Sequence, residues 1–212
     1  MTQLTQRFVD AVDYARQAHA KQVRKGSNIP YIYHLLGVAS LVLEHHGTES
    51  QAIAGLLHDV LEDCGAEHEA TIQEKFGNEV IEIVLACTDG TAESKGKATM
   101  PEAKLADWRE RKLTYLAQLV GKPDGTLLVS GCDKLHNARA ILSDLEDPDV
   151  GMKVFDRFTA GLEGTLQYYE ALSRLFDDRR SVVSRALSST VDRIHAIVAI
   201  SMSNPPRRQA LQ

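Results

Sequence analysis

Four ionisable side chains interrupt an apolar helical segment in the first third of the chain. Residues 52–65 read AIAGLLHDVLEDCG and carry an adjacent His58 and Asp59, followed by Glu62 and Asp63. On a helix of 3.6 residues per turn, these positions are related by spacings of three or four residues and can share one sector. An imidazole and three carboxylates at one spot repel one another and lose hydration unless a cation neutralises them. The segment therefore predicts a largely buried helix with a divalent metal ion beside it.

Helical periodicity dominates the remaining sequence, and alternating β-branched runs are nearly absent, so we expect an all-α fold. The segment at 89–101, rich in glycine, lysine and small polar residues, is predicted to be a loop and a candidate lid. The expected helices cover about residues 4–23, 33–47 and 51–63, a short helix before Gly77, another ending near Thr88, and then 102–119, 127–142, 150–176 and 181–200.

Composition limits the classes of protein to consider. A chain of 212 residues with 43% hydrophobic content can bury one sizeable core, and we expect a helical bundle over residues 1–178 with a C-terminal helix and tail over 179–212. The net charge of -5 argues against nucleic acid as a partner. The three cysteines show no pairing pattern, so we expect reduced thiols.

The sequence offers no apolar run long enough for a membrane span and no apolar stretch typical of a signal peptide near its first residues. We therefore expect a cytoplasmic protein that does not contact membrane. Whether it forms a homo-oligomer is left open.

Two more residues are candidates to complete a ligand set. Asp133 lies in the apolar run at 127–142, where an unpaired carboxylate is costly, although an ion pair with a basic residue is the ordinary alternative. His34 follows IPYIY, where a histidine is more often a polar residue at a helix start or a satisfied core group. The occurrence of all these residues together favours a metal site over the ordinary alternatives, because the pattern H(x23)HD(x73)D with an ED pair three residues beyond the HD is hard to assemble by chance.

This pattern resembles the HD-domain metal-dependent phosphohydrolases. It is similar, more narrowly, to the hydrolase domain of the RelA/SpoT proteins and to their single-domain relatives, the small alarmone hydrolases. The fold implied is a single HD-domain helical bundle. The matching segments are residues 18–34, 52–65, 72–90, 127–142 and 157–172.

The resemblance implies that His34, His58, Asp59 and Asp133 ligate one divalent ion, usually manganese. The residue types support the same assignment. Imidazole and carboxylate ligands suit Mn²⁺, and the lack of cysteine among them argues against a structural zinc site.

Glu62 and Asp63 match the ED pair of the family. That pair is expected just beyond the ligands, where it would orient the attacking water, accept its proton or protonate the leaving group. The alternative is a solvated helix C-terminus before Gly65, a place that the helix dipole makes unfavourable for carboxylates.

The resemblance also suggests residues that contact a nucleotide. Arg24 and Lys25 match the RK that lies along guanine nucleotides in the family, and Asn137 matches an asparagine expected near ribose or phosphate. Lys134 is a less certain candidate. A solvated helix end is the alternative for the RK pair. Further basic residues could meet phosphate, although surface charge is their commoner meaning: Lys95, Lys97, Arg109 and Lys112.

One position differs from the family pattern, and five histidines are given no role at the site. Family members often carry a small hydroxyl residue near Ala140, so one ligand contact could be missing here. The histidines without a partner at ligand spacing are treated as structural or exposed, and they are His45, His46, His68, His136 and His195.

The function implied is Mn²⁺-dependent hydrolysis of the 3′-pyrophosphate of (p)ppGpp to GDP or GTP. Two alternatives remain open. One is the same chemistry on another nucleotide, such as the 2′-phosphate of NADPH or a deoxynucleotide. The other is a catalytically silent HD module that binds a nucleotide and signals to a partner.

Overall fold

The computed structural model describes residues 2–88 and 100–203, and every regular element in these ranges is a helix. The all-α prediction is confirmed. Two residues outside the helices, Val23 and Pro30, form an isolated antiparallel bridge. The α-helices are α1 (Gln6–Ala18), α2 (Ile32–Glu44), α3 (Glu49–Leu57), α4 (Val60–Asp63), α5 (His68–Phe76), α6 (Asn78–Cys87), α8 (Pro101–Leu119), α9 (Asp124–Glu146), α10 (Gly161–Asp178) and α11 (Ser184–Ser203), and a 3₁₀ helix η1 spans Gly151–Arg157.

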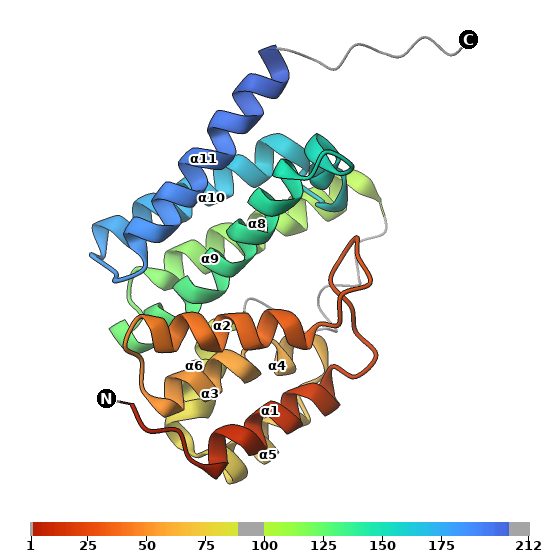
Figure 1. Cartoon of the computed structure of the whole chain (residues 1–212). Helices are drawn as coiled ribbons and strands as arrows, with labels where there is room; N and C mark the ends of the chain where they lie inside the picture. The colour runs from red at the N-terminus through yellow and green to blue at the C-terminus, as the bar shows by residue number, and fades with distance from the viewer. Residues whose placement is uncertain (1, 89–99, 204–212) are drawn as a thin grey trace.

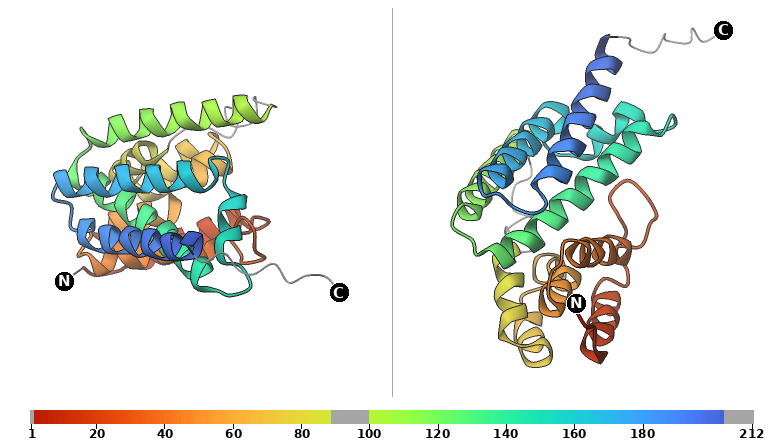
Figure 2. Two further views of the ribbon diagram at one scale, coloured as in Figure 1. Left: turned by 90° about the horizontal axis from the view of Figure 1, so that it is seen from above. Right: turned by 60° about the vertical axis from the view of Figure 1, so that its left-hand side comes forward.

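The helices form two groups. Helices α1 to α6 occupy the lower part of Figure 1, and α8 to α11 the upper part. Helix α9 connects them, because it packs against α2, α3 and α6 on one side and against α11 on the other. The turned views of Figure 2 show α9 passing between the two groups. A polar residue on the inner side of α9 can therefore meet residues from α2 and from the α3–α4 region.

Local sequence explains where α3 begins and how closely it lies to α2. The Thr48 side chain accepts a hydrogen bond from the Gln51 backbone N–H, and the Gln51 side chain accepts one from the Thr48 backbone N–H, which completes a capping box at the start of α3. Gly55 faces Ala39 so closely that a Cβ at Gly55 would lie 3.4 Å from the Ala39 Cα. The missing side chain lets the two helices approach each other.

Three predicted helices are wrong in their extent. The first ends at Ala18 and not near residue 23, and a loop leads from it to α2. The expected helix over 150–176 is a 3₁₀ helix followed by α10, and Gly161 at the junction has φ of +60°. The expected helix over 51–63 is interrupted at His58 and Asp59, which lie between α3 and α4. The cause of this last break is part of the site.

Several other expectations can be compared with the structure. Cys64, Cys87 and Cys132 are free thiols, as predicted. No helix within the described ranges is both long and apolar enough to cross a bilayer. Helix α11 packs on α9 and α10, and the predicted boundary at 178 coincides with the end of α10 but stays a prediction. The predicted loop at 89–101 lies almost wholly outside the described residues.

Candidate metal centre and cleft

The four predicted metal ligands converge in the core. Ligand atoms of His34, His58 and Asp59 lie within 4.8 Å of one another. Asp133 joins them from α9, with its Oδ1 at 3.2 Å from His34 Nε2 and 3.5 Å from His58 Nε2. His34, His58 and Asp133 are only 1%, 3% and 6% exposed. The ligands come from α2, from the α3–α4 junction and from α9.

The break between α3 and α4 orients His58. Its Nδ1 lies 2.9 Å from the Gly55 carbonyl oxygen, which in an unbroken helix would accept from the backbone N–H of Asp59. Because a carbonyl only accepts, Nδ1 must carry the proton. The side chain thus replaces a backbone bond, ends the helix and leaves Nε2 directed at the carboxylates of Asp59 and Asp133.

His34 has a different partner. Its Nδ1 lies 2.9 Å from Nδ1 of His136, one helical turn beyond Asp133 on α9. The two rings meet edge to face, with centroids 4.8 Å apart. Burial, followed by His34 and Arg24, lowers the pKa of His136 to about 4, so this imidazole is neutral at pH 7.

The charges of the cluster depend on one another. Burial disfavours a charge on His58, but Asp59 and Asp133 outweigh it and raise its pKa well above the usual value. Burial likewise opposes ionisation of the two carboxyls. The histidines lower the pKa of Asp59 well below normal, and Lys134 with the same histidines does so for Asp133. The site is therefore poised to hold two carboxylates and to accept a positive charge.

A chain of hydrogen bonds runs outward from Asp133. Its Oδ1 accepts from Asn137 Nδ2 at 2.6 Å, and its Oδ2 accepts from Lys134 Nζ at 2.6 Å. The Asn137 side-chain oxygen in turn accepts from Arg24 Nη2 at 2.8 Å. Asn137 lies four residues beyond Asp133 and shares its face of α9. Of the predicted nucleotide contacts, Lys134 and Asn137 thus bond the predicted metal ligand Asp133 directly, and Arg24 reaches it through Asn137.

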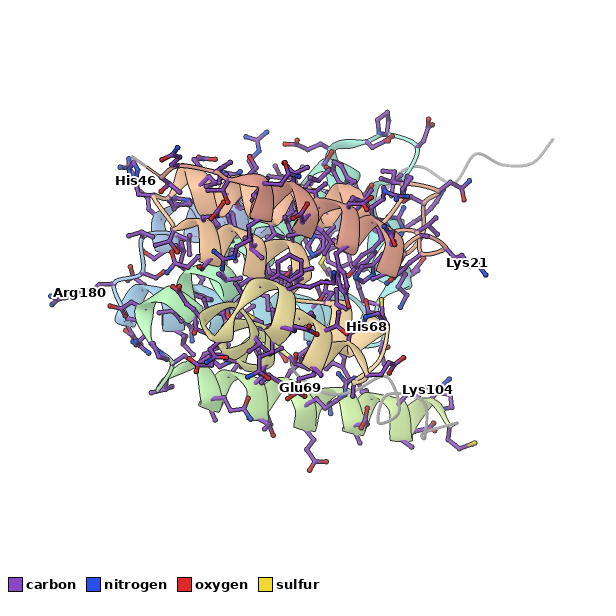
Figure 3. All side chains as sticks on the ribbon, turned by 90° about the horizontal axis from the view of Figure 1, so that it is seen from below. Lys21, His46, His68, Glu69, Lys104 and Arg180 are labelled. Atoms are coloured by element: carbon purple, nitrogen blue, oxygen red, sulfur yellow. The ribbon has the colours of Figure 1, made fainter. Side chains whose placement is uncertain are left out.

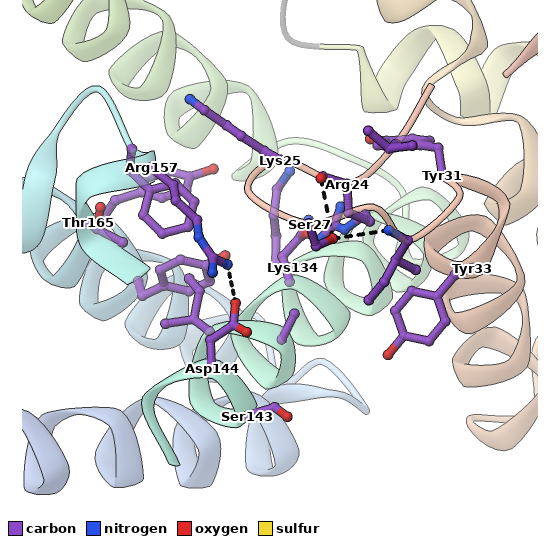
Figure 4. A pocket seen from close by; sticks show the side chains of 18 of the residues that line it. Arg24, Lys25, Ser27, Tyr31, Tyr33, Lys134, Ser143, Asp144, Arg157 and Thr165 are labelled. Carbon is purple, nitrogen blue, oxygen red and sulfur yellow. Dashed lines mark hydrogen bonds and ion pairs between the residues drawn. The ribbon is translucent and has the colours of Figure 1, made fainter. Parts of the chain in front are cut away.

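Beyond this chain a cleft of about 480 Å³ opens, and residues that touch the cluster line it. Tyr31, Lys134 and Asn137 form the part nearest the cluster. Figure 4 shows Arg24 and Lys25 on the loop before α2, and both residues line the cleft. Lys112 also lines the cleft. A cationic cleft against a histidine–aspartate cluster suits a phosphorylated ligand.

The far end of the cleft has its own ion pair. Arg157 Nη1 lies 2.5 Å from Asp144 Oδ2, the contact drawn as a dashed line in Figure 4. The Arg157 side chain also lies against Gly26, which has φ of +79° and where a Cβ would overlap the guanidinium. Arg157 therefore packs on the loop that carries Arg24 and Lys25.

The remaining predicted residues are less tightly placed. Glu62 is half-buried on α4, and Asp63 is exposed and accepts a 2.9 Å hydrogen bond from Gln22. Ala140 lines the cleft, where a hydroxyl was expected to be missing, and Arg109 is exposed on α8. Lys95 and Lys97 lie outside the described residues.

Sequence reasoning missed Tyr31 and the contact made by His136. The Tyr31 hydroxyl donates to Asp59 Oδ2 at 2.7 Å, and burial followed by the Asp59 charge raises the pKa of Tyr31, so the donor stays protonated. The spacing of three residues between Tyr31 and His34 could have indicated a shared face. Figure 3 labels two of the other histidines, His46 and His68. His46 is exposed, and His68 forms a hydrogen bond with the Tyr14 hydroxyl.

The donor set fits a divalent ion. Imidazole nitrogens and carboxylate oxygens are ligands of Mn²⁺, Fe²⁺ and Zn²⁺. Among the described residues, His58 Nε2 is a buried nitrogen that makes no hydrogen bond of acceptable geometry, although Asp59 Oδ2 is 3.1 Å away. A buried polar atom without a hydrogen bond is costly, and a metal ion would satisfy it.

Comparison with known proteins agrees with this geometry. Human guanosine-3′,5′-bis(diphosphate) 3′-pyrophosphohydrolase MESH1 is 30% identical over 182 residues, which cover 81% of this chain and 94% of the human one. A probable guanosine-3′,5′-bis(diphosphate) 3′-pyrophosphohydrolase of Mycoplasma pneumoniae is 29% identical over 79% of this chain. The chain spans only 22% of that protein and 15% to 16% of two other bacterial relatives.

A solved structure and a family model complete the comparison. The structure, described as a metazoan ortholog of SpoT that hydrolyzes ppGpp, matches with a TM-score of 0.57 at 23% identity. The match covers 84% of this chain and 98% of that one, and it supports the fold. The model described as HD domain matches residues 11–164, which include all four candidate ligands. The chain therefore belongs to the HD domain family.

Proposed function

We propose that this protein is a metal-dependent hydrolase that removes the 3′-pyrophosphate of (p)ppGpp and leaves GDP or GTP. The observation that carries the proposal is the buried histidine–aspartate cluster at the inner end of a cationic cleft. The similarity to human MESH1, over nearly the whole length of that protein, supports the choice of substrate.

His34, His58, Asp59 and Asp133 are the residues that would hold the metal, and Mn²⁺ is the ion we propose. When bound, such an ion polarises phosphoryl oxygens and acidifies water. The chain's own groups prepare the site for it. Gly55 orients His58, and Tyr31 holds Asp59 through its hydroxyl.

Glu62 and Asp63 are proposed as the acid–base pair. They belong to α4, which follows Asp59 directly, and Asp63 is exposed and Glu62 half-buried, whereas His34, His58 and Asp133 are buried. One carboxylate would accept the proton of the attacking water, and the proton must reach the departing 3′-oxygen as the bond to pyrophosphate breaks. Gln22, which bonds Asp63, lines the cleft and links this pair to the substrate space.

The cleft is proposed to bind the nucleotide. Arg24 lies over the Tyr31 ring, 5.7 Å from its centroid, and a guanidinium plane can also stack on a purine. Lys25 and Lys134 supply positive charge to phosphate oxygens. Asn137 connects a proposed nucleotide contact with a proposed metal ligand, because it bonds both Arg24 and Asp133.

The test uses metal-stripped protein incubated with ppGpp, with and without Mn²⁺, and separation of products by anion exchange. We expect GDP and pyrophosphate only with Mn²⁺. Parallel reactions with NADPH and a deoxynucleoside triphosphate distinguish the other substrates. Turnover of one of these without turnover of ppGpp would overturn the substrate assignment. Tight nucleotide binding without any turnover would favour the silent module.

A further inference from the structure

His136 is a buried group that the proposed reaction does not use. It is 8% exposed and lies on α9 between the cluster and Tyr33, whose ring meets it edge to face at 5.3 Å. Its Nδ1 faces Nδ1 of His34 at 2.9 Å. A short contact between two imidazole nitrogens is favourable only when one donates and the other accepts, so this pair constrains the protons of both rings.

The direction of the hydrogen bond follows from the other side of His34. Its Nε2 is directed at the carboxylates, 3.2 Å from Asp133 Oδ1 and 3.5 Å from Asp59 Oδ2. A metal ion there needs the lone pair of Nε2, and neutral His34 must then carry its proton on Nδ1. His136 Nδ1 becomes the acceptor, and its own proton moves to Nε2.

Gly37 makes this arrangement possible. It lies within α2, one turn beyond His34, where alanine would be the better helix former. A Cβ at this position would overlap Nε2 and Cδ2 of His136. The glycine therefore leaves the space that the second imidazole occupies, and the sequence accepts a weaker helix at that point.

We propose that His136 is a positioning residue that fixes the tautomer and the orientation of His34, with Gly37 providing its space. The inference rests on the metal-dependent function proposed above. Metal-ligating histidines usually donate to a carboxylate or a carbonyl, and partners of this kind affect metal affinity by about 10- to 100-fold when removed. In this protein the acceptor would be the imidazole of His136.

The test measures metal affinity directly, so it is independent of substrate identity. In His136→Phe the ring remains but the acceptor is lost, and we expect Mn²⁺ to bind about 10- to 100-fold more weakly in competition with a chelator. His136→Asn places an amide oxygen near the position of Nδ1 and should retain most of the affinity. His46→Asn, at an exposed histidine, is the matched control.

Gly37→Ala gives a second and independent readout. Alone, it should displace the His136 ring and weaken Mn²⁺ binding as His136→Phe does. Combined with His136→Ala, which empties the space that the Cβ would enter, it should cause no further loss of affinity beyond that of His136→Ala alone. Helical circular dichroism and thermal unfolding check that each variant folds.

Nitrogen-15 NMR of the zinc-loaded protein reads the tautomers directly. We expect His34 to be protonated on Nδ1 and His136 on Nε2. Unchanged affinity in a folded His136→Phe variant would overturn the proposal, as would equal losses in the Phe and Asn variants. Failure of ppGpp hydrolysis alone would leave these binding results intact and would count against the proposed function instead.

Discussion

The histidine–aspartate cluster and the cationic cleft touch each other but are held in different ways. Three of the four proposed ligands are buried, and the set comes from α2, from α9 and from the short junction between α3 and α4. The cleft draws Arg24 and Lys25 from the loop between α1 and α2, which is closed by the isolated bridge of Val23 with Pro30. The proposed chemistry would therefore rest mainly on packed helices, whereas the proposed recognition would rest on residues of a loop.

The largest effect should follow from a substitution in the histidine–aspartate cluster. Asp59→Asn removes a ligand charge while keeping the side-chain size, so we expect loss of both bound metal and hydrolysis. Metal content after dialysis and product formation measure the two effects. Asp13→Asn, at an exposed carboxylate on α1, is the control. Full activity of the Asp59 variant would contradict the assignment of the site.

Glu62→Gln should separate chemistry from metal binding. Removing a general acid or base costs roughly 10²- to 10⁴-fold in kcat, and Mn²⁺ affinity should change little because Glu62 is not a proposed ligand. Steady-state kinetics and chelator competition are measured on the same preparation. Glu69→Gln, on the exposed side of α5, should leave both unchanged. Loss of metal together with turnover would move Glu62 into the ligand set.

Arg24→Ala tests the cationic cleft. Loss of a charged hydrogen-bonding group costs about 1.5 to 3 kcal/mol, so KM for the nucleotide should rise roughly 10- to 100-fold with a smaller change in kcat. Arg174→Ala, with a side chain 80% exposed on α10, serves as the comparison. An unchanged KM would mean that the cleft recognises phosphate without this guanidinium.

Metal affinity should also depend on pH. In the metal-free protein, Asp59 and Asp133 outweigh burial and hold the His58 pKa above its usual value, so the ring is protonated at neutral pH. Loading must displace that proton, and affinity should increase about tenfold per pH unit until the raised pKa is passed. Calorimetry in buffers of different ionisation enthalpy counts the released proton. Affinity independent of pH would show that His58 is already neutral.

The smallest effect is expected for Tyr31→Phe. It removes one hydrogen bond to the Asp59 carboxylate, worth about 1 kcal/mol, and should weaken Mn²⁺ binding roughly fivefold. Tyr14→Phe, whose hydroxyl bonds His68 away from the cluster, should not. Equal affinity in both variants would leave Tyr31 as a cleft residue only.

Some features of the fold and the site could be predicted from residue spacing, and others depend on tertiary packing. Helix periodicity and the spacing of His58, Asp59 and Asp133 indicated an all-α fold with a metal site, because buried charges are costly and have few explanations. The break between α3 and α4 was not predictable from periodicity, since the His58 side chain takes over a backbone hydrogen bond. The contact of His136 with His34 depends on packing between two distant helices, and no spacing in the sequence encodes it.

The Asn137 side chain has a consequence for energetic coupling. It donates to Asp133 and accepts from Arg24, so it connects a proposed metal ligand with a proposed nucleotide contact through one amide. A nucleotide that withdraws the Arg24 guanidinium changes the hydrogen bonding of Asn137, and with it the charge available at Asp133. By thermodynamic reciprocity, nucleotide must then alter the affinity for the metal by the same factor that the metal alters the affinity for nucleotide. The proposed metal and the proposed nucleotide would then influence each other through the Asn137 amide.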